Sequence, residues 1–383
     1  MPNPMIFDCW ASYGPHPSKD PDQRWTLPQL LEDLDLYGIR AALVRHDQFA
    51  HYDPMHVNRR LTAEIAGHRD RLYPCWCVMP HQAGDFPKPA ALLRAMDAED
   101  VRAAFFTPAT HGYPVHEDVL APLAKALNRR GLLVLTTLAE LGANYETAVR
   151  FCRLFAGCPV IIAEATWAQW RLMSPILDAC PNACIELSAF QANRALEVFA
   201  EQYGAGRVLL GTGLPTRSGG AARGMVDWSL ADDDTVVQVA GLNLARFLKV
   251  PPPAALPVPE AADEMVREAR AGKPLSTLVV DAHCHVLDDG LNGAGNHYVM
   301  VKGDSLNMLE LTRRMGVDVT AMMSWSGTVS MDVAAGNALI AKVVRRSPRE
   351  IIGLSSADPT HQSQAEVRAA CDYLHGELGF RGL

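Results

Sequence analysis

Short apolar runs alternate with longer amphipathic segments along residues 1–250. The apolar runs have the length of buried strands and predict eight of them, at 5–12, 41–45, 73–79, 101–106, 132–137, 160–163, 184–187 and 208–210. Helical periodicity predicts helices between the strands, at 27–37, 55–68, 119–130 and 145–155, and a closing helix at 240–248. Thr26 and Gln29 have the spacing of a capping box before the first helix, and Gly38 marks its end.

Strict alternation of strands and helices favours a parallel sheet with the helices outside it. Eight such units in about 250 residues favour a closed (β/α)8 barrel, the TIM barrel, over an open doubly wound sheet. The Gly-x-Gly-x-x-Gly pattern typical of a dinucleotide-binding fold does not follow the first strand. We therefore expect an α/β protein whose residues 1–250 form a TIM barrel.

The composition restricts the partners of this barrel. A net charge of −8 argues against nucleic acid or an anionic membrane, and no apolar run approaches the roughly 18 residues of a membrane span. Hydrophobic residues at 49% and charged residues at 20% are typical of a globular protein. No signal peptide is visible, and the nine scattered cysteines fit reduced thiols, so a cytoplasmic location is expected.

A proline-rich linker and a short helix, at 251–274, lead to a second region at 275–383. Its first apolar run ends in His283-Cys284-His285. On a strand, residues i and i+2 point to the same face, so His283 and His285 can bind one metal ion while Cys284 points away. Neutral imidazole suits zinc and similar divalent ions. Two surface histidines on an edge strand are the alternative interpretation.

The second region also repeats the order of the first. Asn58, Pro80 and Arg102 recur as Asn337, Pro359 and Arg381, each at an offset of 279 residues, and Asp8 corresponds to Asp281. A constant offset across separated positions predicts a tandem repeat. The second copy then stops inside its fourth strand, about 146 residues before the first copy ends. We expect a partial second β/α barrel.

The His-x-His at the end of an apolar strand, preceded by Asp281 and followed by a glycine-rich loop, resembles the first strand of the amidohydrolase superfamily. The resemblance is to its amidohydrolase-related ("amidohydrolase 2") group of TIM-barrel hydrolases and decarboxylases. It implies that His283 and His285 hold a divalent metal, with zinc expected, and that Asp281 supports them without being a ligand. It also implies hydrolysis or decarboxylation of a small carboxylated substrate. Two interpretations stay open for nearby His297, a contact with the substrate or no role.

The same resemblance places the family's other metal positions in residues 1–250, where the usual ligand types are missing. The strand-one histidines fall on Trp10 and Ser12, the strand-five histidine on Thr136 or Thr137, the strand-six histidine on Glu164, and the late aspartate on Gly213. A mononuclear site needs three or more ligands. We therefore expect the first copy to be a pseudoenzyme without metal, with Trp10 filling the space at the barrel mouth.

Two other functions remain open for the first copy. Chemistry in a TIM barrel takes place at the carboxyl ends of the strands, and polar residues near those ends that could bind a carboxylated ligand are Arg45, His46, His81, His111 and Glu164. The first alternative is a non-catalytic scaffold or ligand-binding barrel. The second is a metal-independent lactone or ester hydrolase. A homodimer is also implied as possible, because barrels of this family often form dimers.

A half barrel leaves one face of its sheet uncovered. Residues 275–383 are therefore expected to present an apolar sheet that docks elsewhere or stays loosely packed. His283 and His285 alone should hold zinc weakly. We expect the 383-residue chain to lack hydrolase activity, and a chain extended by about 146 residues to gain it.

Overall fold

The computed structural model describes residues 5–17, 22–253, 263–271, 273–288 and 299–383. The chain divides into two compact units, Met1–Gln191 with Ala195–Ala261, and Ala192–Arg194 with Ala262–Leu383. His297 and part of the proline-rich linker lie outside the described residues.

The first unit is built on eight parallel strands that pair in chain order, each with the next. They are β1 Phe7–Tyr13, β2 Ala41–His46, β3 Leu72–Val78, β4 Ala103–Phe106, β5 Leu133–Thr137, β6 Val160–Ala163, β7 Ala183–Glu186 and β8 Val208–Leu209. Every predicted strand is present, and its ends lie within two residues of the prediction. Short apolar runs predicted these strands correctly because both faces of each strand are buried.

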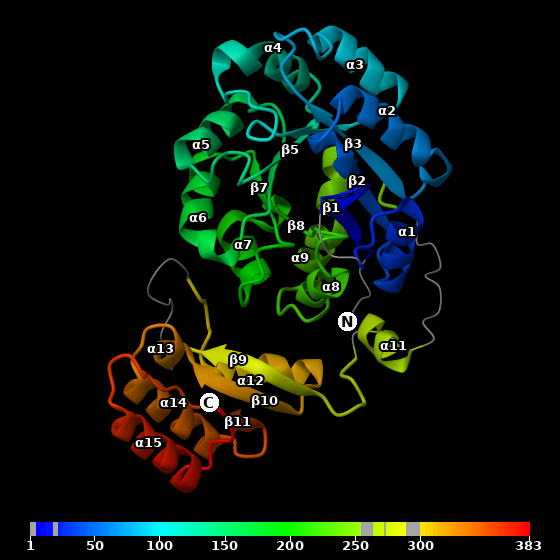
Figure 1. Ribbon diagram of the computed structural model, residues 1–383. Helices are drawn as coiled ribbons and strands as arrows, with labels where there is room; N and C mark the ends of the chain where they lie inside the picture. The colour runs from blue at the N-terminus through cyan, green and yellow to red at the C-terminus, as the bar shows by residue number, and fades with distance from the viewer. Residues whose placement is uncertain (1–4, 18–21, 254–262, 272, 289–298) are drawn as a thin grey trace. The chain divides into compact units, whose positions relative to one another are not determined.

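Helices follow the strands and surround them (Figure 1). They are α1 Leu27–Leu36, α2 Pro54–Glu64, α3 Pro89–Ala98, α4 Glu117–Asn128, α5 Tyr145–Leu154, α6 Trp170–Ala179, α7 Ala195–Tyr203, α8 Gly219–Asp227, α9 Asp233–Val237 and α10 Asn243–Leu248. The predicted capping box of Thr26 and Gln29 is present. The predicted helix 55–68 was too long, because α2 ends at Glu64 and only a 3-10 turn, Ala66–His68, follows. Helices α3 and α6 to α9 were not predicted, and proline and glycine inside α6 and α8 weakened their periodic signal.

Backbone hydrogen bonds bring the two ends of the sheet together. Cys9 N donates to Leu210 O over 3.0 Å, and Gly213 N donates to Trp10 O over 2.9 Å. The segment that follows β8 therefore pairs with β1, and the sheet is a near-closed barrel. The predicted TIM barrel is confirmed.

Alternation along the strands decides which side chains enter the barrel. Ala41 and Leu43 of β2 and Leu133 and Leu135 of β5 belong to one buried cluster with Cys9. The next residues in each series, two positions further on, therefore also point inward, at the carboxyl ends of the strands. In β2 that residue is an arginine and in β5 a threonine.

Asn58 on α2 ties that helix to the neighbouring strand. Its Nδ2 donates to Cys77 O over 2.8 Å, and its Oδ1 accepts from Cys77 N over 2.9 Å. Asn58 is 2% exposed. The buried amide therefore bonds both the C=O and the N–H of a buried strand residue.

Replacing Asn58 with alanine should lower the free energy of unfolding by about 2–3 kcal/mol, because two buried hydrogen bonds are lost. Urea denaturation of the full chain measures this change. Arg59→Ala, at an exposed position of the same helix, is the matched control and should change stability by less than about 0.5 kcal/mol. An equal effect of both substitutions would contradict the role of the amide.

The second unit contains three parallel strands in the order β11-β10-β9. They are β9 Val280–Val286, β10 Val319–Ser324 and β11 Ile351–Gly353, and a parallel bridge from Leu354 to Gly382 begins a further pairing. The helices are α11 Glu264–Arg270, α12 Ser305–Met315, α13 Trp325–Thr328, α14 Val333–Arg346 and α15 Gln364–Asp372.

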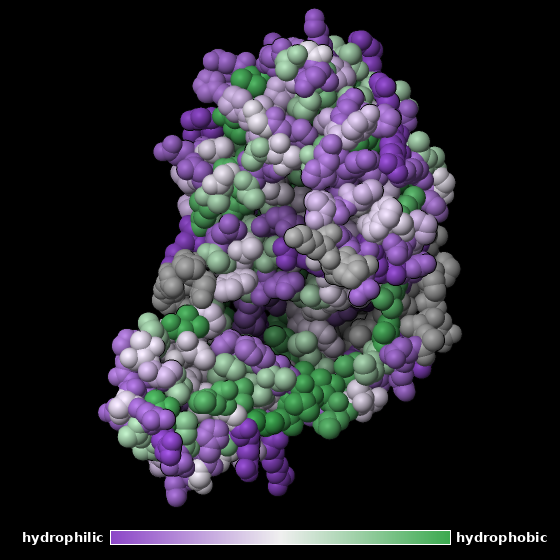
Figure 2. Space-filling view, viewed as in Figure 1, coloured by the Kyte–Doolittle hydropathy of each residue, from purple (hydrophilic) through white to green (hydrophobic). Residues whose placement is uncertain are grey.

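Only one face of this sheet is buried among the described residues. Cys284 and Val286 pack with Met322 against α12 and α14, so the prediction that Cys284 is packed is correct. In contrast, Leu278 and Val280 are 75% and 51% exposed. Figure 2 shows apolar surface gathered over the start of β9. None of the helices in the described ranges is long and apolar enough to span a membrane.

Local details of the two units correspond closely. The pairing register shifts between Asp8 and Ala11 in β1, and between Asp281 and Cys284 in β9. In both places the aspartate Oδ1 accepts from the backbone N–H two residues later, over 2.8 Å and 3.0 Å. The Asn58 clamp also recurs, because Asn337 exchanges two hydrogen bonds of 2.9 Å and 2.8 Å with the backbone of Ser356.

Candidate functional site

The mouth of the first barrel is occupied by a network that joins three of its strand ends. Trp10 Nε1 on β1 donates to Glu164 Oε1 over 2.6 Å, directly after β6. Arg217 Nη2, in the segment after β8, donates to Glu164 Oε2 over 3.1 Å. These residues stand at or near the positions where the resemblance places metal ligands. An indole donor and an ion pair therefore occupy this space.

Glu164 reaches this network through an unusual backbone conformation. Its φ is +58°, in the left-handed region that non-glycine residues rarely adopt. Because Ile161 and Ala163 point into the barrel, an extended Glu164 would point outward. The left-handed turn directs its carboxylate to Trp10 and Arg217 instead. Such strain costs about 1–3 kcal/mol and is common at functional sites.

Arg45, near the end of β2, points into the barrel and stacks on Trp10. Its guanidinium carbon lies 3.2 Å from the centre of the Trp10 ring and 5.1 Å from that of Phe105. The side chain is almost completely buried, and Nη1 has no hydrogen-bond partner among the described residues. Burial lowers its pKa, opposed most by the charge of nearby Asp47.

Two further carboxylates lie close enough to Arg45 to favour its charged form, Asp47 and Glu186. Asp47 accepts from Ser12 Oγ over 3.0 Å, and burial raises its pKa to about 6. Glu186, the last residue of β7, accepts from the backbone N–H and, over 2.9 Å, the hydroxyl of Ser188. Burial raises the pKa of Glu186 to about 7. The mouth therefore carries groups that can exchange protons near neutral pH.

The other predicted residues lie at different places. His46 is buried beside Tyr13 on the outer face of β2, and its Nδ1 accepts from Gln48 N. His111 uses both ring nitrogens, at 2.7 Å from Thr107 Oγ1 and 3.1 Å from Phe49 O. His81 is half-buried in the loop after β3. These histidines therefore do not join the network of Trp10 and Glu164.

The position of the strand-five histidine was left open between two threonines. Thr136 faces outward and donates to Phe106 O over 3.0 Å. Thr137 continues the inward series of Leu133 and Leu135. Alternation therefore favours Thr137 as the residue at the mouth.

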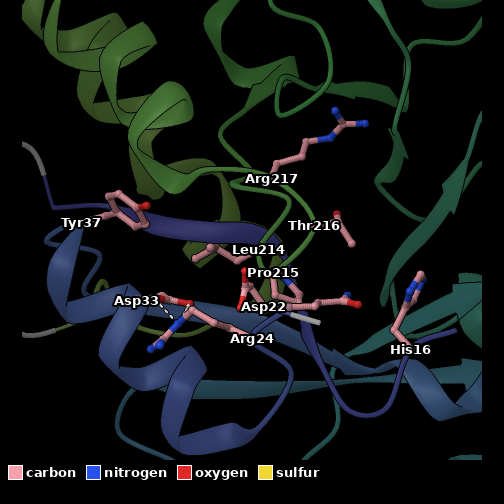
Figure 3. Close-up of a pocket in the computed structure, with 10 residues that line it drawn as sticks. His16, Asp22, Arg24, Asp33, Tyr37, Leu214, Pro215, Thr216 and Arg217 are labelled. Atoms are coloured by element: carbon pink, nitrogen blue, oxygen red, sulfur yellow. Dashed lines mark hydrogen bonds and ion pairs between the residues drawn. The ribbon is translucent and has the colours of Figure 1, made fainter. Parts of the chain in front are cut away.

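A pocket of about 290 Å³ adjoins the mouth on the side of the segment after β8. Figure 3 shows Arg217 and Thr216 on one side of it, and Arg24 held to Asp33 by an ion pair of 2.8 Å on the other. The Nε of Arg217 is buried and has no hydrogen-bond partner among the described residues. Arg217 thus contacts both the mouth network and the pocket.

In the second unit the two predicted metal ligands lie side by side. The Nε2 atoms of His283 and His285 are 3.1 Å apart. The Nδ1 of His285 lies 3.4 Å from Thr328 Oγ1, and its ring packs edge-on against Trp325. Burial and the charge of His283 lower the pKa of His285. Two ligands at about 2.0–2.1 Å from a tetrahedral zinc are about 3.3 Å apart, so the pair fits two coordination positions.

Within the ranges that the structure describes, no group of three or more His, Cys, Asp or Glu side chains could hold a metal ion. Asp281 uses its Oδ1 to accept from His283 N over 3.0 Å.

Several residues of the first mouth were missed by the sequence reasoning. Asp47, Glu186 and Arg217 had no motif around them. Glu186 was detectable, because a charged residue at the end of an apolar strand and two positions after an inward Cys184 must point inward. The partner of Arg217 depends on the left-handed turn at Glu164, for which the sequence offers no local signal.

Comparison with solved structures shows the same fold. A 5-carboxyvanillate decarboxylase from Sphingomonas paucimobilis has a TM-score of 0.51 at 13% identity, over 64% of this chain and 99% of that one. A 2,6-dihydroxybenzoate decarboxylase from Rhizobium has a TM-score of 0.53 at 13% identity, over 64% and 99%. A dihydroxybenzoic acid decarboxylase from a Polaromonas species, with bound manganese and the inhibitor 2-nitroresorcinol, has a TM-score of 0.51 at 13% identity, over 64% and 97%.

Sequence comparisons identify the family of the chain. None of the curated proteins matches the chain. The amidohydrolase family model matches residues 8–250, which is more than half of the chain and includes the barrel and its mouth. The chain therefore belongs to the amidohydrolase family.

Proposed function

We propose that residues 275–383 are a second copy of the first part of the barrel, and that the metal-dependent chemistry of this chain belongs to that copy. The chemistry is hydrolysis of a C–O or C–N bond, or decarboxylation, of a small carboxylated substrate. The first barrel performs no metal-dependent reaction. The recurring register shift, aspartate hydrogen bond and asparagine clamp support the repeat.

One contrast carries the proposal. At corresponding places in β1 and β9, the first unit has Trp10 hydrogen-bonded to Glu164, whereas the second has two histidines with converging Nε2 atoms. An indole nitrogen has no lone pair to offer a metal. Two neutral imidazoles do, and they suit divalent ions of the first transition row.

A divalent ion held by His283 and His285 would act as a Lewis acid toward a carbonyl or carboxylate of the substrate. In this chain Thr328 would orient the imidazole of His285, and Asp281 would fix the strand that carries both rings. The described residues offer only two metal ligands, whereas a mononuclear site needs three or more. We therefore expect catalytic turnover only when additional ligands complete the site. Aromatic acid decarboxylases of the same fold, one with bound manganese, support this class of chemistry.

Zinc should bind the full chain at one ion per molecule, and manganese should bind at the same place more weakly, because nitrogen ligands prefer zinc to manganese. Four-ligand zinc sites are worth about 10–16 kcal/mol, and half of that corresponds to a Kd of about 1–200 µM. Isothermal titration calorimetry of metal-free protein measures the affinity. His283→Ala and His285→Ala should each weaken binding at least tenfold.

The matched control is His361→Ala, an exposed histidine of the second unit outside this pair. It should leave the affinity unchanged. Trp10→Ala should do the same, because the first mouth holds no ion in this proposal. Metal binding that survives the loss of both His283 and His285 would rule the assignment out. The choice of zinc, a homodimer and a cytoplasmic location remain predictions from the sequence.

A further inference from the structure

Two cysteines of the first unit lie together, outside both candidate sites. Cys152 is on α5 and Cys180 caps the carboxyl end of α6, and these two helices pack side by side on the outside of the barrel (Figure 1). Both thiols are free and buried. The thiol of Cys180 donates to Val149 O over 3.9 Å. Because a helical carbonyl faces the residues one turn further on, this contact places Cys180 Sγ beside Cys152, and the two thiols are hydrogen-bonded to each other.

Hydrogen bonds also hold the backbone around this pair. Asn182 Nδ2, two residues after Cys180, donates to Cys152 O over 3.0 Å. Arg207 Nη2 donates to Cys180 O over 2.8 Å. The two cysteines are therefore held together through their backbones as well as their sulfurs. A disulfide needs such proximity, because it cannot form between distant cysteines without movement of the backbone.

The two thiols differ in acidity. The hydrogen bond from the Cys152 thiol, together with the positive charges of Arg153 and Arg207, lowers the pKa of Cys180 against the effect of burial. The same hydrogen bond and burial raise the pKa of Cys152. The thiolate is the reactive form of cysteine. Cys180 is therefore the thiol that reacts first with an oxidant, and Cys152 is the thiol that reacts second.

We propose that Cys152 and Cys180 form a reversible disulfide between α5 and α6 when the protein meets hydrogen peroxide. The Cys180 thiolate attacks one peroxide oxygen, the O–O bond breaks and hydroxide leaves, which gives a sulfenic acid. The Cys152 sulfur then attacks the Cys180 sulfur, the S–O bond breaks, and the hydroxyl leaves as water with the proton of Cys152. In total, two thiols and one peroxide give one disulfide and two water molecules.

Burial of both sulfurs controls the rate of this reaction. Cys180 is 1% exposed, but it directly follows α6, and Pro181 beside it is exposed. Helix ends open more readily than buried core segments. Oxidation should therefore proceed through opening of the last turn of α6, and it should be faster in urea below the unfolding transition.

The disulfide would close the segment 152–180, which contains β6 and Glu164. A bond of this kind stabilises a protein mainly by restricting its unfolded chain. The unfolding temperature of the first unit should therefore rise by about 5–10 °C on oxidation, and fall again after reduction with dithiothreitol. The oxidation state of this pair thus regulates the stability of the part of the barrel that carries Glu164.

Peptide mapping of the full, metal-free chain tests the proposal, after treatment with hydrogen peroxide and blocking of the remaining thiols with iodoacetamide. Trypsin releases Cys152 in one peptide and Cys180 with Cys184 in another. Mass spectrometry should detect these two peptides joined and lighter by two hydrogen atoms than their sum. Fragmentation should place the bond on Cys180. Dithiothreitol should separate the two peptides.

Cys180→Ala should abolish both the joined peptides and the rise in unfolding temperature. The matched controls are Cys184→Ala, in the same tryptic peptide, and Cys371→Ala, a partly exposed cysteine of the second unit. Both should keep the bond and the temperature shift. The thermal unfolding curve of each reduced variant checks its folding, and the wild-type peptide map gives a decision without any variant.

A bond from Cys152 to Cys184 in the wild type would overturn the proposal. So would oxidation of Cys180 to a sulfinic acid without a bond, or no joined peptides at millimolar peroxide. None of these variants alters His283 or His285, so failure here leaves the metal assignment standing.

Discussion

Asp8→Ala should lower the free energy of unfolding of the first unit by about 3–5 kcal/mol. The Asp8 carboxylate is fully buried and accepts three hydrogen bonds, from Trp10 N, Thr212 N and Thr212 Oγ1. Thr212 follows β8, so these bonds hold the first strand to the last where the barrel closes. Alanine would leave all three donors buried without an acceptor, at about 1–3 kcal/mol each before relaxation.

Asp8→Asn is the matched control for this position. Its amide oxygen can still accept from Trp10 N and Thr212 N, and the hydroxyl of Thr212 can rotate to accept from the new N–H. We expect a loss of about 1 kcal/mol. Denaturation in urea, followed by tryptophan fluorescence, measures both variants. A loss below about 1 kcal/mol for Asp8→Ala would mean that the closing seam does not depend on this carboxylate.

Glu186→Gln should gain about 3 kcal/mol of stability relative to the wild type between pH 4.5 and pH 8. Burial raises the pKa of Glu186 from its usual 4.5 to about 7. The folded state therefore binds a proton that the unfolded state has released between these pH values. The contribution of Glu186 to stability is complete below about pH 4.5 and is lost as pH rises through about 7, at about 1.4 kcal/mol per unit.

Glutamine cannot titrate, so the difference between variant and wild type isolates this carboxyl group. Asp47 titrates in both proteins, and its contribution cancels to first order. Urea denaturation at pH 4.5, 6 and 8 measures the difference. Glu201→Gln, an exposed position on α7, controls for the loss of one negative charge. A difference that does not change with pH would show that Glu186 is not titrating in this range.

The sequence alone determined the barrel, because its strands are buried on both faces and are read as continuous apolar runs. Local hydrophobicity was enough to predict each of these strands, and all of β1 to β8 are present in the structure. The helices were predicted less completely. In α6 and α8, proline and glycine disturb the local pattern, and packing against the sheet decides that these segments are helical.

For the candidate sites, the sequence predicted which way the side chains point, but not which partners they contact. The side-by-side arrangement of His283 and His285 follows from the two-residue period of a strand, so the motif was sufficient to predict it. The period also fixes that Arg45 points inward and His46 outward. Only the tertiary structure brings Glu164 to Trp10 and Arg217, because that contact joins β1, β6 and the segment after β8 through a left-handed residue. Local pattern determines which face a side chain is on, whereas its partners depend on the closure of strands that are far apart in the chain.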